Sequence, residues 1–378
     1  MHPDVFAAAA LRGENPLGAH TQWVQDRQKT AGLERWAKKH LEHTDIVVLE
    51  ASGNSFEVVE RLAKCGIMAL VLESVQAAAL QDNYCNDDRH SAVKLARVYL
   101  SGLAKIVWAP DEKTREYREI CFAHRNAVAD TTRARNRIRS YLNEHCVRLS
   151  TGAVLNREST LELMKAARKW TALQLTIIEQ RHAQLSEAEN RRKTFEKLMI
   201  QELLANPQWA QLWRLMGVRH RVAFALMAII GDIRRFATAK KLVGYIGLAP
   251  GKNQSGNDQA GTKKGIGGFG RKDLRSLLLQ SAQNALNQKG SPLHKWGWRL
   301  TVRKHRNLAA AAVARKLTVA IWHLLMGHFT PLTEITKHLQ TKLLKLATTL
   351  GKPTLQSMGF ASRDEFINSH IKSIQLPT

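Results

Sequence analysis

The sequence predicts an α/β fold for the N-terminal part of the chain and an all-α fold for most of the remainder. Three observations carry this prediction. Apolar and β-branched runs alternate with amphipathic stretches between residues 5 and 101, as in a sheet with parallel pairing. Two long stretches with helical periodicity follow between residues 110 and 206. After Pro207, helical stretches flank a loop rich in glycine.

Strands and helices are expected to alternate in the N-terminal part. The expected elements are a strand at 5–11, a helix at 33–41, a strand at 46–49, a helix at 56–65, a strand at 68–72 and a helix at about 91–101. Glu50 directly follows the second strand, and Asp88 precedes the last helix. Acids at such positions can converge on one edge of a sheet. On the residues alone, however, Glu50 is expected to be a surface acid at a strand end.

A long helix is predicted to begin at Pro110-Asp111, because proline fixes φ and an acid favours a helix N-terminus, and to reach Glu144. Its arginines form two i, i+4 pairs with few acids nearby: Arg133 with Arg137, and Arg135 with Arg139. An ordinary solvated helix is the alternative, but solvated faces usually mix charge signs. These arginines are therefore expected to bind nucleic acid.

A second long helix is predicted over residues 160–204. Its apolar residues keep a heptad-like rhythm, which suggests a helical hairpin or an intermolecular coiled coil. Asn206-Pro207 marks a boundary, after which helices are expected at 215–230, 272–287 and 307–326. Gly217 breaks the first of these, as in a helix-hairpin-helix motif. That turn is either a contact to a nucleic-acid backbone or a packing turn.

The composition points to a polyanionic partner. The formal net charge is +25 and the pI is about 10.2, so nucleic acid is expected, with an anionic membrane surface as the alternative. The longest apolar stretch, Val222–Ile230, is too short to cross a membrane. No signal peptide is visible, and the four cysteines are scattered without a metal or disulfide pattern. A cytoplasmic protein without a membrane partner is therefore expected.

The loop between Leu248 and Arg275 combines glycines with cations, which are Lys252, Lys263, Lys264, Arg271 and Lys272. Such a density of glycine is expected to forbid a regular helix or strand. Bare backbone amides beside cations suit a phosphate-bearing partner. A flexible solvated loop is the alternative, and on the residues alone Ser255 within it would be a turn residue. Neither a dinucleotide fingerprint nor a P-loop is complete here.

A colinear series of motifs runs through the chain. They are Val47–Gly53, Asn86–Arg89, Trp108–Asp111, Leu215–Val218, Gly231–Ile233, Gly244–Pro250, Gln254–Gly256, Gly270–Arg275 and Ala310–Leu317. This series resembles the DEDD transposases of bacterial insertion sequences (the IS-one-ten group). That family includes Piv-type DNA invertases and recombinases guided by a bridge RNA. The resemblance covers nearly the whole chain up to about residue 330.

The resemblance implies an organisation into four parts. They are an RNase H-like (RuvC-like) nuclease-type domain at 1–109, a basic long-helix and coiled-coil region at 110–206, a mostly helical transposase domain with a Ser-Gly loop at 207–330, and a basic tail at 331–378. It further implies DNA as substrate, a guide (bridge) RNA as partner, and a homodimer or homotetramer.

The resemblance also implies a metal site of four acids in the order Asp, Glu, Asp, Asp. Glu50 matches the second acid and Asp88 the third, and together they would hold Mg²⁺, a hard cation that takes oxygen ligands. Two positions depart from the pattern. Ser91 stands where the fourth acid is expected, and the first acid falls at or before Met1. The N-terminal domain is therefore expected to be truncated and its metal site incomplete.

Ser255 matches the serine of the family's Ser-Gly motif, which acts as the nucleophile on a DNA phosphodiester. The implied function is that of a transposase or site-specific recombinase working by serine transesterification with Mg²⁺. The alternative is a catalytically degenerate relative that binds DNA or RNA. A purely structural coiled-coil scaffold is a third reading, but it would not need the basic glycine loop. No His or Asp at fixed spacing supports a hydrolase triad.

Overall fold

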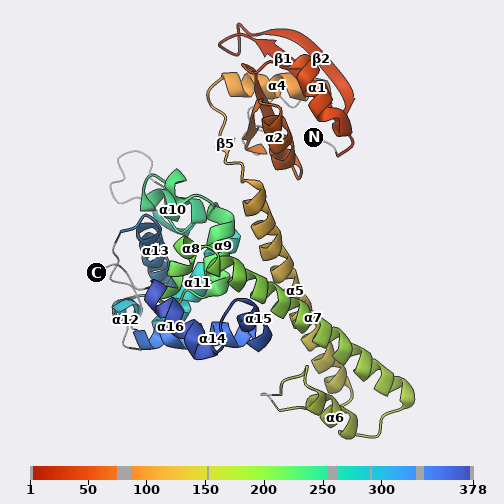
Figure 1. Cartoon of the computed structure of the whole chain (residues 1–378), viewed down its shortest axis with the longest axis vertical. Coiled ribbons are helices and arrows are strands. Elements are labelled where there is room, and N and C mark those ends of the chain that lie inside the picture. Colours follow the sequence, from red (N-terminus) through yellow and green to blue (C-terminus); the bar gives the residue numbers. More distant parts are fainter. Residues whose placement is uncertain are drawn as a thin grey trace. The chain divides into compact units, whose positions relative to one another are not determined.

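A computed structural model describes residues 3–74, 87–150, 153–253, 262–289, 292–328 and 336–374. The chain divides into two compact units, Met1–Lys113 and Thr114–Thr378 (Figure 1). The first unit combines short strands with helices, and the second is almost entirely helical. The division into an α/β N-terminal part and a helical remainder is therefore confirmed.

The first unit holds two small sheets. Its elements are β1 (Val5–Arg12), β2 (His20–Lys29), α1 (Leu33–His40), β3 (Ile46–Glu50), α2 (Ser55–Lys64), β4 (Met68–Leu72), α4 (Asp88–Leu100) and β5 (Ile106–Val107). Strands β3 and β4 pair in parallel, as expected, and β5 joins β4 antiparallel. Strands β1 and β2 form a separate antiparallel pair. Among the described residues the strands therefore form a two-stranded and a three-stranded sheet, and an RNase H-like arrangement is not confirmed.

Strand β2 was absent from the sequence prediction. Its residues, HTQWVQDRQK, are mostly polar and exposed, so they lack the apolar alternation that marks a half-buried strand. The strand is held by pairing with β1 and by the ring of Trp23, which packs edge-on against Trp36 of α1 with centroids 6.0 Å apart. The core of the unit lies between these elements and α2, around Phe6, Leu33 and Leu62.

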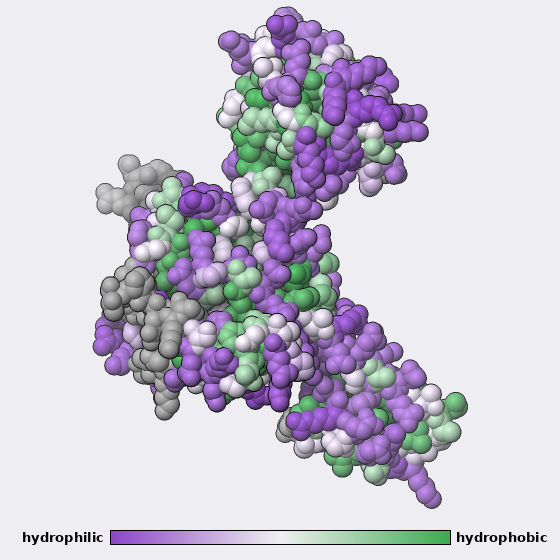
Figure 2. All heavy atoms as spheres, viewed as in Figure 1, coloured by the Kyte–Doolittle hydropathy of each residue, from purple (hydrophilic) through white to green (hydrophobic). Residues whose placement is uncertain are grey.

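The second unit begins with two long helices. Helix α5 spans Glu112–Glu144, as predicted, and α7 spans Ala172–Leu204. They run antiparallel, because Arg135 pairs with Glu189 and Tyr117 donates to Glu202, 2.9 Å away. The helical hairpin is therefore confirmed, whereas an intermolecular coiled coil is not. In the view of Figure 2 the hairpin shows mostly hydrophilic side chains.

The single helix predicted over residues 160–204 is wrong, because the chain forms α6 (Glu158–Ala166) and then α7. Thr171 caps the start of α7 by accepting a hydrogen bond from the amide of Gln174, whose side chain bonds back to the Thr171 amide. This capping box satisfies amides that would otherwise lack a partner. Trp170 fills the break and donates its indole N–H to the Met164 carbonyl, 2.9 Å away.

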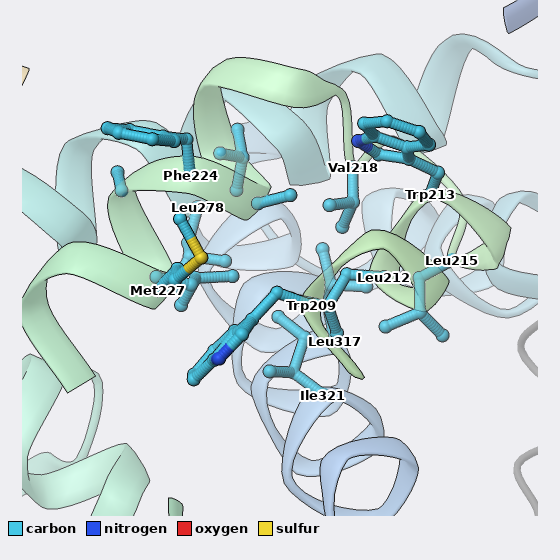
Figure 3. Packing of buried hydrophobic residues seen from close by; sticks show 14 of the residues in the cluster. Trp209, Leu212, Trp213, Leu215, Val218, Phe224, Met227, Leu278, Leu317 and Ile321 are labelled. Carbon is cyan, nitrogen blue, oxygen red and sulfur yellow. The ribbon is translucent and has the colours of Figure 1, made fainter. Parts of the chain in front are cut away.

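The rest of the second unit surrounds one apolar helix. Its elements are α8 (Pro207–Ala210), η2 (Gln211–Arg214), α9 (His220–Ile230), η3 (Ile233–Arg235), α10 (Ala239–Ile246), β6 (Pro250–Asn253), β7 (Thr262–Ile266), α11 (Lys272–Asn287), α12 (Pro292–Arg303), α13 (Arg306–Leu325), α14 (Thr336–Leu350), α15 (Lys352–Ser357) and α16 (Arg363–Ile374). Every residue of α9 from Val222 to Ile230 is buried. Figure 3 shows Phe224 and Met227 of α9 packed near Leu278 of α11.

Helix α13 is long and apolar enough to cross a membrane, so the prediction that Val222–Ile230 is the longest apolar stretch, and that none approaches this length, is wrong. Two thirds of its apolar window, 67%, is buried inside the protein. Leu317 and Ile321 of this helix lie in the core beside Trp209 and Leu212 (Figure 3). The burial explains the apolar composition of α13 as that of a core helix.

Residues 331–378, expected as a basic tail, include the helices α14 to α16. Leu343 of α14 and Phe366 of α16 are fully buried in the same core as α9. The Lys342 ammonium donates hydrogen bonds to the carbonyls of Trp213, Leu215 and Val218, at 2.8, 2.8 and 2.9 Å. The C-terminal helices therefore help to build the core.

The Gly217 turn, for which the sequence left a nucleic-acid contact and a packing turn open, packs against α11. Gly217 has a φ of +73°, and a Cβ at this position would collide with the carbonyl oxygen of Ser281 in α11. Leu215, Met216 and Val218 around it are all buried. The Lys342 ammonium donates to the Leu215 and Val218 carbonyls of this turn, so these carbonyls are satisfied from within the protein.

Candidate functional site

The glycine-rich loop rises from a short hairpin. Strands β6 and β7 pair antiparallel, with Asn253 opposite Thr262. The expectation that the glycines forbid any strand is therefore wrong at the two ends of the loop. Residues 254–261, which connect these strands, include Ser255 and lie outside the described residues, as do the side chains of Lys252, Lys263 and Lys264.

The base of the hairpin is held by two glycines in close contact. Gly247 and Gly270 have φ values of +81° and +87°, and a Cβ on Gly270 would lie 2.6 Å from the Gly247 nitrogen. Arg275 donates to the carbonyls of Gly267 and Phe269, both at 2.9 Å, and to that of Gly247 at 3.2 Å. One guanidinium thus ties the segment after β7 to the segment before β6.

Gly270→Ala is expected to lower the free energy of unfolding by about 1–3 kcal/mol, because alanine is strained at positive φ and its Cβ meets the Gly247 backbone. The matched control is Gly268→Ala, where a Cβ meets nothing within 4 Å, so its effect should stay within about 0.5 kcal/mol. Urea unfolding followed by circular dichroism measures both variants. Equal effects at the two positions would contradict the close contact described above.

Arg271, predicted to contact nucleic acid, is engaged inside the protein. Its guanidinium binds both carboxylate oxygens of Asp273, at 3.1 and 2.7 Å. Burial opposes ionisation of Asp273, but the hydrogen bonds and charge of Arg271 outweigh it and lower the pKa of that carboxyl. Lys272, by contrast, is exposed at the start of α11. Lys272 is therefore accessible, as its predicted contact to nucleic acid requires, while Arg271 supports the base of the loop.

Three arginines that the sequence prediction did not select also support this region. Arg118 of α5 donates to the Ala228 carbonyl at the end of α9, 3.0 Å away. Arg235 donates to the Ile230 carbonyl at 2.9 Å and lies over the ring of Tyr245, 4.7 Å from its centroid. Arg315 donates to the Leu248 carbonyl at 3.1 Å, directly before β6. Arg315 stands in the Ala310–Leu317 motif, so a sequence signal existed for it.

The four arginines of α5 that were predicted to bind nucleic acid divide into two groups. Arg133 is paired with Asp130 at 2.5 Å, and Arg135 with the buried Glu189 of α7. Arg137 and Arg139 are exposed, and neither forms an ion pair within the described part of the chain. Of these four arginines, Arg137 and Arg139 are therefore the two without an ion-pair partner among the described residues.

The two predicted acids lie on elements that pack together. Glu50 is the last residue of β3 and Asp88 the first of α4, and α4 contacts β3. Both side chains are exposed. Helix α4 begins at Asp88, three residues before the predicted start at about Ser91. Both acids supply the oxygen ligands that Mg²⁺ prefers.

Asp87 is occupied by the helix that follows it. Its carboxylate accepts from the His90 amide at 2.7 Å and contacts the His90 ring nitrogen at 2.7 Å. The amide hydrogen bond is the main reason that the pKa of Asp87 lies below its usual value. Across the described ranges, no three His, Cys, Asp or Glu residues gather into a metal-binding group. Glu50 and Asp88 thus fit a magnesium site in chemistry, but they supply only two of its acids.

Comparison with known proteins gives matches along most of the chain. Residues 3–147 match a DEDD family model described as "Transposase". Residues 210–296 match the "Transposase IS116/IS110/IS902 family". The first match covers the unit with Glu50 and Asp88, and the second covers the β6–β7 hairpin.

Individual relatives carry the same description. The putative transposase y4qE of Sinorhizobium fredii is 23% identical over 350 residues, which are 83% of this chain and 84% of the relative. The transposase for insertion sequence element IS1111A of Coxiella burnetii is 24% identical over 283 residues, 74% of this chain and 77% of the relative. The transposase for IS1328 of Yersinia enterocolitica is 25% identical over 199 residues, 52% of this chain and 58% of the relative.

Proposed function

Because the chain belongs to the DEDD transposase family of insertion sequences, we propose that it exchanges DNA strands by serine transesterification at Ser255. One observation carries the proposal: the chain holds both family regions in order, at 3–147 and 210–296. The first region contains Glu50 and Asp88, and the second contains the loop with Ser255.

In the proposed reaction the Ser255 hydroxyl oxygen attacks a DNA phosphorus atom. A Ser–O–P bond forms, the bond from phosphorus to the 3′ oxygen breaks, and the serine proton leaves while the 3′ oxygen gains one. The number of phosphoester bonds is unchanged, so a 3′ hydroxyl from another strand can reverse the step without ATP. The nucleophile needs activation, because a free hydroxyl is weakly nucleophilic.

Glu50 and Asp88 would hold Mg²⁺, which when bound neutralises charge on a phosphate under attack. The chain's own contribution is the placing of cations. Lys252, Lys263 and Lys264 flank Ser255 in the sequence and would offset the negative charge that develops on phosphorus oxygens. Arg271 and Arg275 would hold the hairpin beneath them.

The proposal extends to partners. Duplex DNA and a guide (bridge) RNA would bind through the phosphate backbone, since the net charge is +25 and Arg137 and Arg139 are exposed. A homodimer or homotetramer would bring two DNA strands together for exchange. The surface of the α5–α7 hairpin is where we expect such a nucleic-acid contact.

A plasmid recombination assay tests the function. The purified protein, the ends of an insertion sequence, a target plasmid and candidate guide RNA are combined with Mg²⁺, and new junctions are detected by amplification and sequencing. We expect junctions with Mg²⁺ and none after chelation by EDTA. If the protein bound DNA but formed no junctions with any matched combination of element ends and guide RNA, recombinase activity would be contradicted.

A second candidate function is a DNA- or RNA-binding relative without recombinase activity. Ser91 favours it, because a hydroxyl stands where the family has its fourth carboxylate. The same plasmid assay separates the two candidates, since this relative binds DNA and yields no junctions.

A further inference from the structure

A groove of about 380 Å³ lies between α12 and α13. Its wall is apolar where Trp296 and Leu300 of α12 face Val319 of α13, and cationic where Lys304, Arg315 and Lys316 line it. The two helices pack tightly beside it, because Gly297 has no side chain to separate α12 from Val313. Neither the family motifs nor the predicted site residues include this groove as a whole.

The charge around the groove is of one sign. No acidic residue occurs between Asp273 and Glu334. The exposed cations on and next to the two helices are Lys295, Arg299, Arg303, Lys304 and Lys316. None of them forms an ion pair to any residue that the structure describes. The surface therefore offers phosphate-binding charge without a competing carboxylate.

Trp296 is the aromatic element of the groove. It is half-buried against the core, and the Lys316 ammonium lies 4.5 Å from its ring centroid. Arg315 connects the groove to the β6–β7 hairpin, because its guanidinium also binds the Leu248 carbonyl directly before β6. An indole next to cations, in an open apolar groove, is the arrangement by which proteins hold unpaired bases.

We propose that this groove receives an unpaired base of single-stranded DNA beside the strand that is cut in the Ser255 loop. The base lies against Trp296, and the neighbouring phosphates contact Lys304 and Lys316. The choice of DNA as the ligand rests on the proposed function. Arg315 links the groove to the β6–β7 hairpin, whose connecting loop contains Ser255. When the DNA duplex is unpaired near the exchanged phosphodiester, such a base becomes available to the groove.

The test measures binding of a fluorescein-labelled oligo-dT strand by anisotropy, with the full-length protein in the absence of any strand exchange. We expect Trp296→Leu to weaken binding roughly 5- to 150-fold, the range that one base–aromatic stacking contact contributes, and Trp296→Phe to retain most of the affinity. Trp298→Leu is the matched control. Trp298 lies on the same helix, is 55% exposed and stacks on His294, but does not line the groove.

A strand with abasic sites supplies the second arm. It should bind the wild type and Trp296→Leu equally, because the base is missing. Equal binding of oligo-dT by all variants, or equal losses for Trp296→Leu and Trp298→Leu, would overturn the inference. If Trp296→Leu lost more affinity for oligo-rU than for oligo-dT, the choice of DNA as the ligand would be overturned. The binding assay involves no cleavage, so its result is independent of the plasmid assay. A failure of the plasmid assay would contradict the proposed function and leave the groove proposal to be judged by binding.

Discussion

Ser255→Ala is expected to abolish strand exchange in the plasmid assay, by about 10⁴-fold or more, since no other group replaces an activated nucleophile. The affinity for duplex DNA should remain within about twofold of the wild type, because one hydroxyl adds little to an interface dominated by phosphate contacts. Junction yield and gel shifts measure the two quantities. Ser255→Cys is expected to retain a trace of activity, since sulfur can also attack.

Ser276→Ala is the matched control for this change. Ser276 is an exposed serine on α11, in the same unit as the loop, and its loss should leave both quantities unchanged. Full activity in Ser255→Ala would move the nucleophile to another residue. A large loss of DNA affinity in Ser255→Ala would mean that the serine acts in binding.

Glu196→Ala is expected to lower the free energy of unfolding by about 1.5–3 kcal/mol, because it removes a buried carboxylate that accepts charge-assisted hydrogen bonds. The Glu196 carboxylate of α7 accepts from Arg192 at 2.7 Å and from Arg221 at 2.6 Å, and His124 of α5 lies 3.4 Å away. This network joins the hairpin to α9 of the core. Urea unfolding is the measurement.

Glu187→Ala is the control on the same helix. The Glu187 carboxylate is exposed and lies 3.8 Å from Arg191, so its loss should cost about 0–1 kcal/mol. A similar result for Glu196 and Glu187 would show that the buried network adds no stability.

The same network predicts sensitivity to acid. Burial opposes ionisation of Glu196, but the His124 hydrogen bond and the charges of Arg221 and Arg192 lower its pKa to about 2. A lowered carboxyl pKa stabilises the folded state above the unfolded value of 4.5, and this stability is lost as the pH falls toward 2. Burial lowers the pKa of His220 to about 4, so the unfolded state binds a proton more readily than the folded state, and stability falls as the pH drops from 6.5 toward 4. Stability should therefore fall below about pH 6.

Elements with strong local signals were predicted closely from the sequence. The β-branched run that ends at Glu50 forms β3, and Pro110-Asp111 precedes α5, which ends at Glu144. The break before Thr171 was missed, because a heptad-like rhythm continues across it and hides the capping box. Helices α14 to α16 were missed because their evidence is tertiary: Leu343 and Phe366 become core residues only when α14 packs on α16 and on α7.

The candidate site was predicted in part. The sequence names the candidate cations but not their partners within the protein, since Arg135 meets an acid 54 residues away in the sequence and Arg271 pairs with Asp273, two residues further on. The supporting role of Arg118 depends on the Ala228 carbonyl and has no sequence signature, whereas Arg275 and Arg315 lie within motifs that the sequence analysis named. The apolar groove beside Trp296 likewise arises only from the packing of α12 on α13.

The covalent intermediate tests the central claim most directly. The protein is incubated with labelled element ends, matched target DNA and guide RNA in the presence of Mg²⁺, quenched in detergent, and separated on a denaturing gel. We expect the wild type to form a protein–DNA adduct that survives denaturation, and we expect Ser255→Ala to form none. An adduct that persists in Ser255→Ala, or a wild type that recombines DNA without any adduct, would contradict serine transesterification at Ser255.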